Sequence, residues 1–300
     1  MKNIVIDLYP DLSYKTSVLL AFKIFLYHNA SYHLLVVGKG SDLPVLSGIE
    51  GLATFEVPEG ESTAEAAIKE VLKGGTAGLI SFTPRPAFYQ TAKTLFPKAV
   101  NPCYALSYKT HKDDKETLIL EVSGLFERSE SYLDAALSYG KDYLVNVLNR
   151  IDPTIGLLGM EEALDPVLAS FDEKMRQDKK YRGLVAPEDL FDGECDLLLS
   201  AGTDGAMAIR AAKGSRLISK AMMESEANKS TGSKFTSLFA FGGKKGKEDK
   251  SEDPRIDAMG YLLFGFGYNI ISLNRDAGYN DFFKAAEKLE QIDRIKVFHQ

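Results

Sequence analysis

The chain alternates between short apolar runs and longer segments in which apolar residues recur every three or four positions. Short runs rich in Val, Ile and Leu predict buried strands, and the longer spacing predicts helices that cover them. The expected strands are residues 3–7, 32–38, 53–57, 76–82, 117–122, 154–159, 181–185, 196–200 and 268–273. The expected helices are residues 15–28, 63–73, 87–95, 131–149, 166–178 and 281–292, with helical turns at 42–47 and 187–191. Because a strand that is followed by a helix returns to a parallel strand, this order predicts an α/β protein with a mostly parallel sheet.

The rest of the pattern is less regular. We expect residues 104–108 to be irregular, residues 109–116 to form a solvated hairpin turn, and residues 259–267 to be an apolar stretch of no assigned type. The chain has 300 residues, of which 45% are hydrophobic, and it shows no internal repeat. That composition is enough to bury a large core, so we expect residues 1–300 to form a single α/β domain.

Residues 225–254 differ from their surroundings because they are rich in Ser, Gly and Lys, and we expect this insertion to be mobile. It also holds an apolar cluster close to several lysines, formed by Phe235, Leu238, Phe239 and Phe241. Exposed aromatic residues beside lysines suit contact with an anionic membrane or an acidic partner. The alternative is that the cluster packs onto its own domain or onto a second copy of the chain.

Residues 196–214 predict a buried strand, a glycine-containing loop and a helix. The backbone N–H groups at the start of such a helix bind phosphate in many α/β proteins. The candidate phosphate-binding residues are Gly202, Thr203, Asp204 and Gly205. The alternative is a plain connection in which Asp204 caps the helix, because isolated glycines make a weak motif.

Charge and composition exclude several classes of function. The chain has 36 basic and 42 acidic residues, a net charge of −6, so no overall positive field favours nucleic acid as a partner. Cys103 and Cys195 are isolated and the histidines are scattered, so neither a metal site nor a disulfide framework is expected. No strand is followed by a GxGxxG loop, so a Rossmann-type nucleotide site is disfavoured and no cofactor is expected.

The distribution of apolar residues also bears on location. The amino-terminal apolar run is too short for a signal peptide, and it is followed at once by an acid, Asp7. No run approaches the roughly 18 apolar residues of a transmembrane helix. We therefore expect a cytoplasmic protein that touches a membrane only peripherally, at its inner face, if at all.

In the order of its elements, the chain resembles the PlsX-type phosphate acyltransferases, which belong to a wider group with the phosphate acetyl- and butyryltransferases. The similarity covers nearly the whole chain. The segments that carry it are 4–7 with Asp11, 35–38, 78–81, 118–122, 155–158 with Glu161 and Glu162, 196–202 with Gly205, and 269–272.

The resemblance implies a three-layer α/β/α fold like that of the isocitrate and isopropylmalate dehydrogenases, and a homodimer. It implies transfer of an acyl group from an acyl carrier protein thioester to inorganic phosphate, as a step of phospholipid synthesis. The lysine-rich insertion falls where that family contacts the membrane and acyl carrier protein.

This chemistry needs groups that hold phosphate against a thioester carbonyl and stabilise the developing oxyanion. Arg85 is the candidate for orienting phosphate, and Asp7, Glu121 and Arg275 are candidates for polar positioning in the catalytic site. The alternatives are that Arg85 is a surface residue held between prolines and that Arg275 forms a salt bridge with a nearby aspartate.

Several motifs depart from the family pattern. Residues 7–11 keep two acids but lack the family's glycines, and residues 81–87 contain Pro84 and Pro86, which have no N–H to donate. These changes favour a second hypothesis, a paralogue that keeps the fold and serves as a binding or scaffold protein. Residues 273–278 also resemble the acetyl-phosphate-forming C subunit of the glycine reductase complex, which is a third alternative.

Overall fold

The computed structural model describes residues 2–110, 115–126, 128–230 and 260–295. Its strands are β1 (Lys2–Asp7), β2 (Tyr32–Gly38), β3 (Leu52–Glu56), β4 (Thr76–Ser81), β5 (Cys103–Lys109), β6 (Glu116–Leu120), β7 (Ile155–Leu158), β8 (Tyr181–Val185), β9 (Leu197–Leu199), β10 (Tyr261–Phe264) and β11 (Ile270–Ser272). Its helices are α1 (Lys15–His28), α2 (Thr63–Leu72), α3 (Arg85–Leu95), α4 (Glu130–Asn146), α5 (Pro166–Met175), α6 (Asp204–Ser230) and α7 (Tyr279–Ile295). Short 3₁₀ turns occupy Pro44–Leu46, Glu161–Ala163 and Pro187–Asp189.

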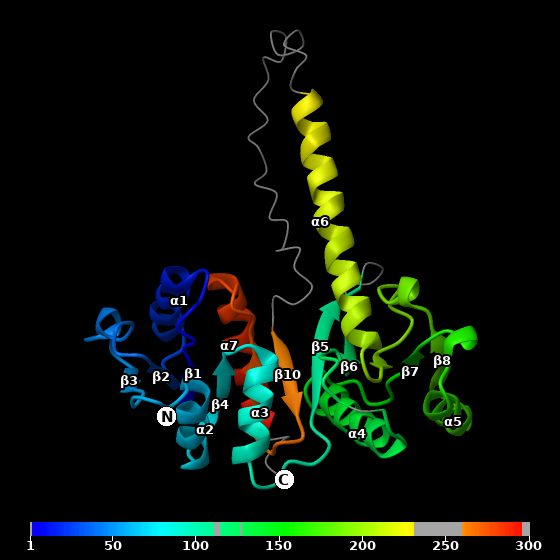
Figure 1. The fold of residues 1–300 in the computed structure, drawn as a ribbon, viewed down its shortest axis with the longest axis horizontal. Helices are drawn as coiled ribbons and strands as arrows, with labels where there is room; N and C mark the ends of the chain where they lie inside the picture. The colour runs from blue at the N-terminus through cyan, green and yellow to red at the C-terminus, as the bar shows by residue number, and fades with distance from the viewer. Residues whose placement is uncertain (1, 111–114, 127, 231–259, 296–300) are drawn as a thin grey trace.

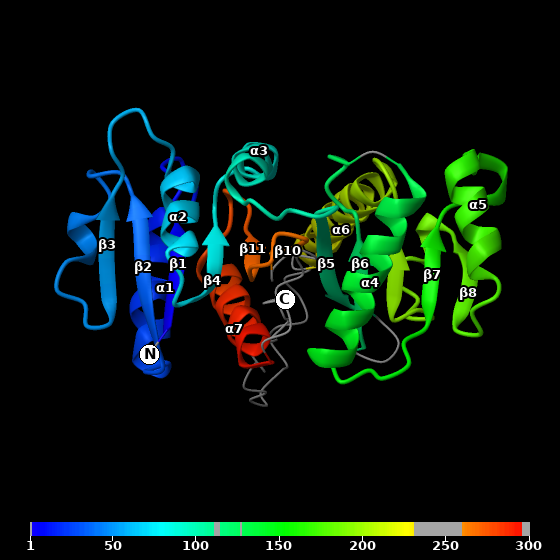
Figure 2. The ribbon, with the colours of Figure 1, turned by 90° about the horizontal axis from the view of Figure 1, so that it is seen from below.

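The strands form one 11-stranded sheet in the order β3-β2-β1-β4-β11-β10-β5-β6-β9-β7-β8 (Figure 2). Strands β3, β2, β1, β4 and β11 are parallel to one another and make the first parallel group; β6, β9, β7 and β8 make the second parallel group. Between them, β10 pairs antiparallel with β11 and β5, and β5 pairs antiparallel with β6. The two parallel groups therefore run in opposite directions along the sheet.

Helices cover both faces of this sheet, because alternate strand residues are apolar on each side. One core cluster joins Ile4 and Ile6 of β1 to helices α1, α4, α5 and α7. The other joins Val5 of β1 to helices α2, α3 and α6. This arrangement confirms the predicted three-layer α/β/α fold with a mostly parallel sheet.

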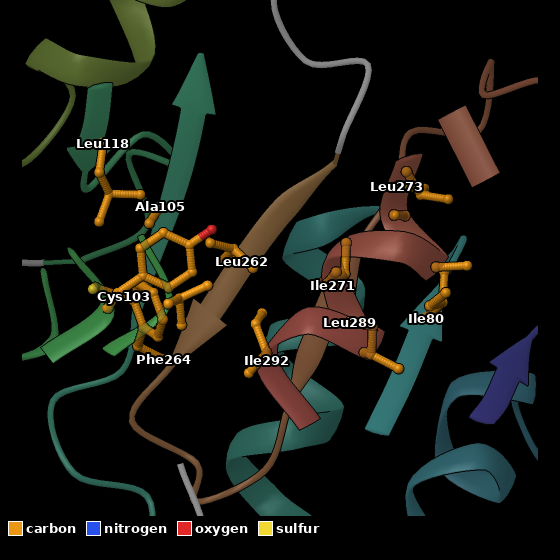
Figure 3. Close-up of a cluster of buried hydrophobic side chains, with 14 of the residues drawn as sticks. Ile80, Cys103, Ala105, Leu118, Leu262, Phe264, Ile271, Leu273, Leu289 and Ile292 are labelled. Atoms are coloured by element: carbon orange, nitrogen blue, oxygen red, sulfur yellow. The ribbon is translucent and has the colours of Figure 1, made fainter. Parts of the chain in front are cut away.

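The centre of the sheet is packed where the two parallel groups meet. Figure 3 shows Leu262 and Phe264 of β10 beside Cys103 of β5 on one side and Leu289 and Ile292 of α7 on the other. All of these side chains are at most 5% exposed. The core is therefore continuous from one parallel group to the other.

Local sequence sets the starts of several helices. Ser62 accepts a hydrogen bond from the backbone of Glu65 at the start of α2, and Asp165 caps α5 in the same way. Two stretches differ from the prediction. Residues 104–108, expected to be irregular, lie in β5, and the unassigned apolar stretch 259–267 contains β10. Both are central strands that pair antiparallel, and their short apolar runs carry little periodicity.

Helix α6 extends far beyond the body of the molecule (Figure 1). Its first turns pack on the sheet through Ile209, whereas Leu217, Ile218 and Met222 are 69%, 62% and 60% exposed. Among the described residues, no helix is long and apolar enough to cross a membrane.

Candidate functional site

The first parallel group contains a topological switch point. The chain runs from β1 to β2 and β3 on one side, then returns to β4 on the other side of β1. The connections that leave β1 and β4 lead to α1 and α3, which cover opposite faces of the sheet. In open α/β sheets, ligands bind at the carboxyl ends of the strands beside such a point.

A row of polar residues follows this edge of the sheet. Asp7 of β1 is in register with Ser81 of β4, Ser81 with Ser272 of β11, and Ser272 with Tyr261 of β10. Residues in register point to the same face, and here it is the face that α2, α3 and α6 cover. We call Asp7, Ser81, Ser272 and Tyr261 the polar row.

Asp7 is completely buried in the polar row. The hydroxyl of Ser81 donates a hydrogen bond of 2.5 Å to its Oδ2, and Ser81 Oγ in turn accepts one from the backbone N–H of Thr83. Burial raises the pKa of Asp7, and the hydrogen bond from Ser81 offsets only part of that effect. The buried carboxyl group therefore holds its proton at a higher pH than an ordinary aspartate.

Arg85 lies beside the polar row at the first residue of α3. Its guanidinium carbon is 3.9 Å from the centre of the Tyr261 ring, and Nη1 donates a 2.7 Å hydrogen bond to the side-chain oxygen of Asn274. The preceding residue, Pro84, supplies no side-chain cap, and the first turn of α3 carries no acid. A half-buried cation thus stands at an uncapped helix start, which favours an anionic ligand.

Glu121 lies elsewhere, at the carboxyl end of β6 in the second parallel group. Its carboxylate accepts hydrogen bonds from the backbone N–H groups of Ser123 and Gly124 and from the hydroxyls of Ser123 and Tyr132. Its φ of 60° places it in the left-handed region, which is strained for a residue other than glycine. Burial raises the pKa of Glu121 despite these bonds. The contacts order the loop that follows β6.

The glycine loop at 202–205 packs against that same loop. A Cβ on Gly205 would lie 2.2 Å from Ser200 Oγ and 2.3 Å from the Glu121 carbonyl oxygen. The two segments therefore approach too closely to leave room for a side chain at position 205. The guanidinium of Arg128 bridges Asp165, the cap of α5, and Asp204, in the first turn of α6. Internal carboxylates thus stand at both helix starts, where an anion would otherwise bind.

The remaining predicted residues are placed as follows. Arg275 is exposed and follows Asn274, and its carbonyl accepts a hydrogen bond from the backbone of Ser13. The apolar cluster at Phe235, Leu238, Phe239 and Phe241 lies outside the described residues. The structure therefore places Asp7 and Arg85 in the first parallel group, with Arg275 in a neighbouring loop, and Glu121 and the glycine loop in the second parallel group. Tyr104 of β5 contacts both sides: its hydroxyl donates to the Arg85 carbonyl, and its carbonyl accepts from the Glu121 backbone N–H.

Comparison with known proteins bears on this arrangement. A phosphate acyltransferase of Bacillus pumilus (strain SAFR-032) is 26% identical over 261 residues, covering 82% of this chain and 72% of that protein. Another, of Mycoplasmopsis pulmonis (strain UAB CTIP), is 24% identical over 201 residues, covering 64% of this chain and 59% of that protein. Over most of its length this chain is therefore similar in sequence, at low identity, to the phosphate acyltransferases. No family model matches it.

Solved structures agree with this relationship at the level of the fold. The crystal structure of a phosphotransacetylase from Streptococcus pyogenes superposes with a TM-score of 0.62, covering 98% of this chain and 94% of the other. Sequence identity in that comparison is 12%, so it shows the shared fold and nothing finer. The overall fold of this chain is thus one that a phosphotransacetylase also has.

Several residues beside the site were not among those predicted from sequence. Ser81, Ser272 and Tyr261 complete the polar row, and Lys213 of α6 reaches within 6.0 Å of the Tyr261 ring centre. A usable signal existed for the serines, since both are polar residues that end buried apolar strands. Lys213 offered no such signal, because only the tertiary fold brings α6 next to β10.

Proposed function

We propose that this chain transfers an acyl group from a thioester to inorganic phosphate at the polar row. The observation that carries the proposal is Arg85, which stands at the uncapped start of the helix that follows β4 and contacts Tyr261 of the polar row. Relatedness to phosphate acyltransferases supports it. Both point to a transferase whose acceptor is an anion.

The chemistry asks for positioning and charge stabilisation. An oxygen of phosphate attacks the carbonyl carbon of the thioester, the carbon–sulfur bond breaks, and the thiolate leaves and takes up a proton. The product is an acyl phosphate. Arg85 orients the phosphate and neutralises charge, and hydroxyl donors at the row are suited to the developing oxyanion. Asp7 acts through Ser81, because the carboxyl group is fully buried and bonded to that hydroxyl.

For the donor, we propose the thioester of acyl carrier protein, with the product serving phospholipid synthesis in the cytoplasm or at the inner face of the membrane. The alternative donor is a short acyl group, as in the acetyl-phosphate-forming C subunit of the glycine reductase complex. A series of acyl thioesters from two carbons upward distinguishes them, because the preferred chain length differs.

A second candidate function is a binding or scaffold protein that has kept the fold without the reaction. Two features of the structure favour it. Pro84 and Pro86 remove backbone donors at α3, and the pairs of Arg128 with Asp165 and Asp204 occupy the helix starts in the second parallel group. Binding of acyl carrier protein without turnover would support this function over catalysis.

We also propose that the chain assembles as a homodimer through the outer part of α6. A solitary helix that exposes Leu217, Ile218 and Met222 is marginally stable in water, and exposed apolar patches mark interaction surfaces. A second copy of the chain presents the same apolar face, so pairing of the two helices would cover the exposed face of each. The membrane contact proposed for Phe235, Leu238, Phe239 and Phe241 is tested separately, by vesicle sedimentation of the full chain.

Formation of acyl phosphate tests the proposed reaction. The protein is incubated with acyl carrier protein thioesters and phosphate, and the product is trapped with hydroxylamine as the hydroxamate. The expected result is hydroxamate that depends on both the thioester and phosphate. Absence of product above the enzyme-free rate at every chain length would overturn the proposal and leave the binding function.

A further inference from the structure

Two cations from different parts of the chain meet at one aromatic ring. Arg85 of α3 lies 3.9 Å from the centre of the Tyr261 ring, and the ammonium nitrogen of Lys213 on α6 lies 6.0 Å from the same point. The two charges are thus no further apart than the sum of these distances. Figure 1 shows α3 and α6 on either side of β10, which Tyr261 begins.

Like charges at this separation repel one another, and an anion between or beside them turns the repulsion into attraction. The partners of Arg85 do not neutralise it. Its hydrogen bond goes to the amide oxygen of Asn274 and its ring contact to Tyr261, and no carboxylate pairs with it among the described residues. Arg85 thus brings an unneutralised positive charge to the site.

A second, independent feature points to a ligand at the same place. Ser272 is the register neighbour of Tyr261 and shares its face of the sheet, and it is completely buried. Its hydroxyl has no hydrogen-bond partner within the described part of the chain. A buried hydroxyl without a partner is unfavourable, so a ligand oxygen that accepts its hydrogen bond is stabilising.

We propose that Arg85, Lys213 and Tyr261 form a phosphate subsite whose two cations come from opposite sides of the junction between the parallel groups. The inference deepens the proposed function, on which it rests, by adding Lys213 as a residue that contacts the phosphate. The chemistry recognised is a tetrahedral phosphate dianion, either free or as a monoester, since several oxygens can meet both cations and the hydroxyl. The site contrasts with the loop at 202–205, where Asp204 brings negative charge.

Equilibrium binding of phosphate to the full chain tests the subsite. Isothermal titration with inorganic phosphate compares the natural chain with Lys213→Gln and with the control Lys93→Gln, which alters an exposed lysine of α3. The expected result is that Lys213→Gln weakens phosphate binding about tenfold or more, because the variant loses one hydrogen bond to a charged group. Lys93→Gln leaves the Kd unchanged, and Lys213→Arg restores most of the affinity.

A parallel titration with phenyl phosphate distinguishes the two forms of the ligand. Tighter binding of the free ion assigns the subsite to inorganic phosphate, and tighter binding of the ester assigns it to a phosphomonoester; either result upholds it if Lys213→Gln weakens that binding. No binding of either ligand, or equal affinity of the natural chain and Lys213→Gln, overturns it.

The result of the phosphate-binding experiment can be distinguished from the result of the acyl phosphate assay. Binding that depends on Lys213 without acyl phosphate formation upholds the subsite and refutes the proposed function. If acyl phosphate forms and Lys213→Gln leaves the KM for phosphate unchanged, the proposed function is upheld and the subsite is refuted.

Discussion

Replacement of Gly205 by alanine tests whether this glycine is required by packing. The added Cβ would meet Ser200 Oγ at 2.2 Å and the Glu121 carbonyl oxygen at 2.3 Å. The Ser200 hydroxyl is held in place because it donates hydrogen bonds to the carbonyls of Leu120 and Glu121. The Glu121 carbonyl oxygen belongs to the backbone, so it cannot rotate away from the added Cβ. Overpacking of this kind costs about 1–3 kcal/mol, and we expect the upper part of that range.

Gly214→Ala is the matched control, because the same substitution is made in the same helix. A Cβ on Gly214 would have no atom within 4 Å, so alanine there gains only helix propensity. It should stabilise the protein by about 0.5–1 kcal/mol. The two variants should therefore move the free energy of unfolding in opposite directions.

The assay is urea unfolding followed by circular dichroism, with the slope of the transition checked for constancy. Gly205→Ala should lower the midpoint and Gly214→Ala should raise it slightly. If Gly205→Ala is as stable as the natural chain, the close approach of α6 to the loop after β6 is wrong. The glycine would then be free to serve anion binding alone.

Three further predictions concern the core, a titrating group and the assembly. Tyr143→Phe removes a buried hydroxyl that has no partner among the described residues, so we expect no loss of stability in thermal unfolding. Tyr108→Phe loses a 2.6 Å hydrogen bond to the Leu190 carbonyl and should cost about 1–3 kcal/mol of stability. Equal losses of stability in the two variants would contradict this expectation. Burial raises the pKa of Asp7, so its contribution to stability is complete below the ordinary carboxyl pKa and is lost as pH rises through the folded-state pKa. In urea unfolding, Asp7→Asn should therefore gain stability relative to the natural chain as pH rises above about 4, and a constant difference between pH 4 and 8 would refute it. Leu217→Lys places charge on the exposed face of α6 and should shift sedimentation equilibrium from dimer to monomer, whereas an unchanged mass would exclude that face as the interface.

The sequence was sufficient for strands with Val-, Ile- and Leu-rich runs, such as β1 and β2, and for most helices, such as α2 with its cap Ser62. It was insufficient at the centre of the sheet. Strand β10 has four residues and β5 mixes polar and aromatic residues, so neither run had a distinctive period. These strands reverse the direction of the second parallel group, and every crossover pattern had favoured parallel pairing.

That reversal explains the division of the predicted site. Asp7 and Arg85 were identified as candidates for the chemistry that the family resemblance implies, and the structure places each at or just after the end of an apolar strand. Glu121 also follows an apolar strand, but that strand, β6, runs in the opposite direction to β1 and β4. Tyr261 and Lys213 became neighbours of Arg85 only through the antiparallel centre, which local patterns did not predict.

The dependence of acyl phosphate formation on phosphate concentration, measured for the natural chain and for Arg85→Gln, tests the central claim most directly. Loss of an interaction with a charged group amounts to about 1.5–3 kcal/mol, so kcat/KM for phosphate should fall by roughly 10- to 150-fold in Arg85→Gln. The natural chain should show saturable turnover. Turnover that is equally fast in Arg85→Gln, or absent from the natural chain, would contradict catalysis at the polar row.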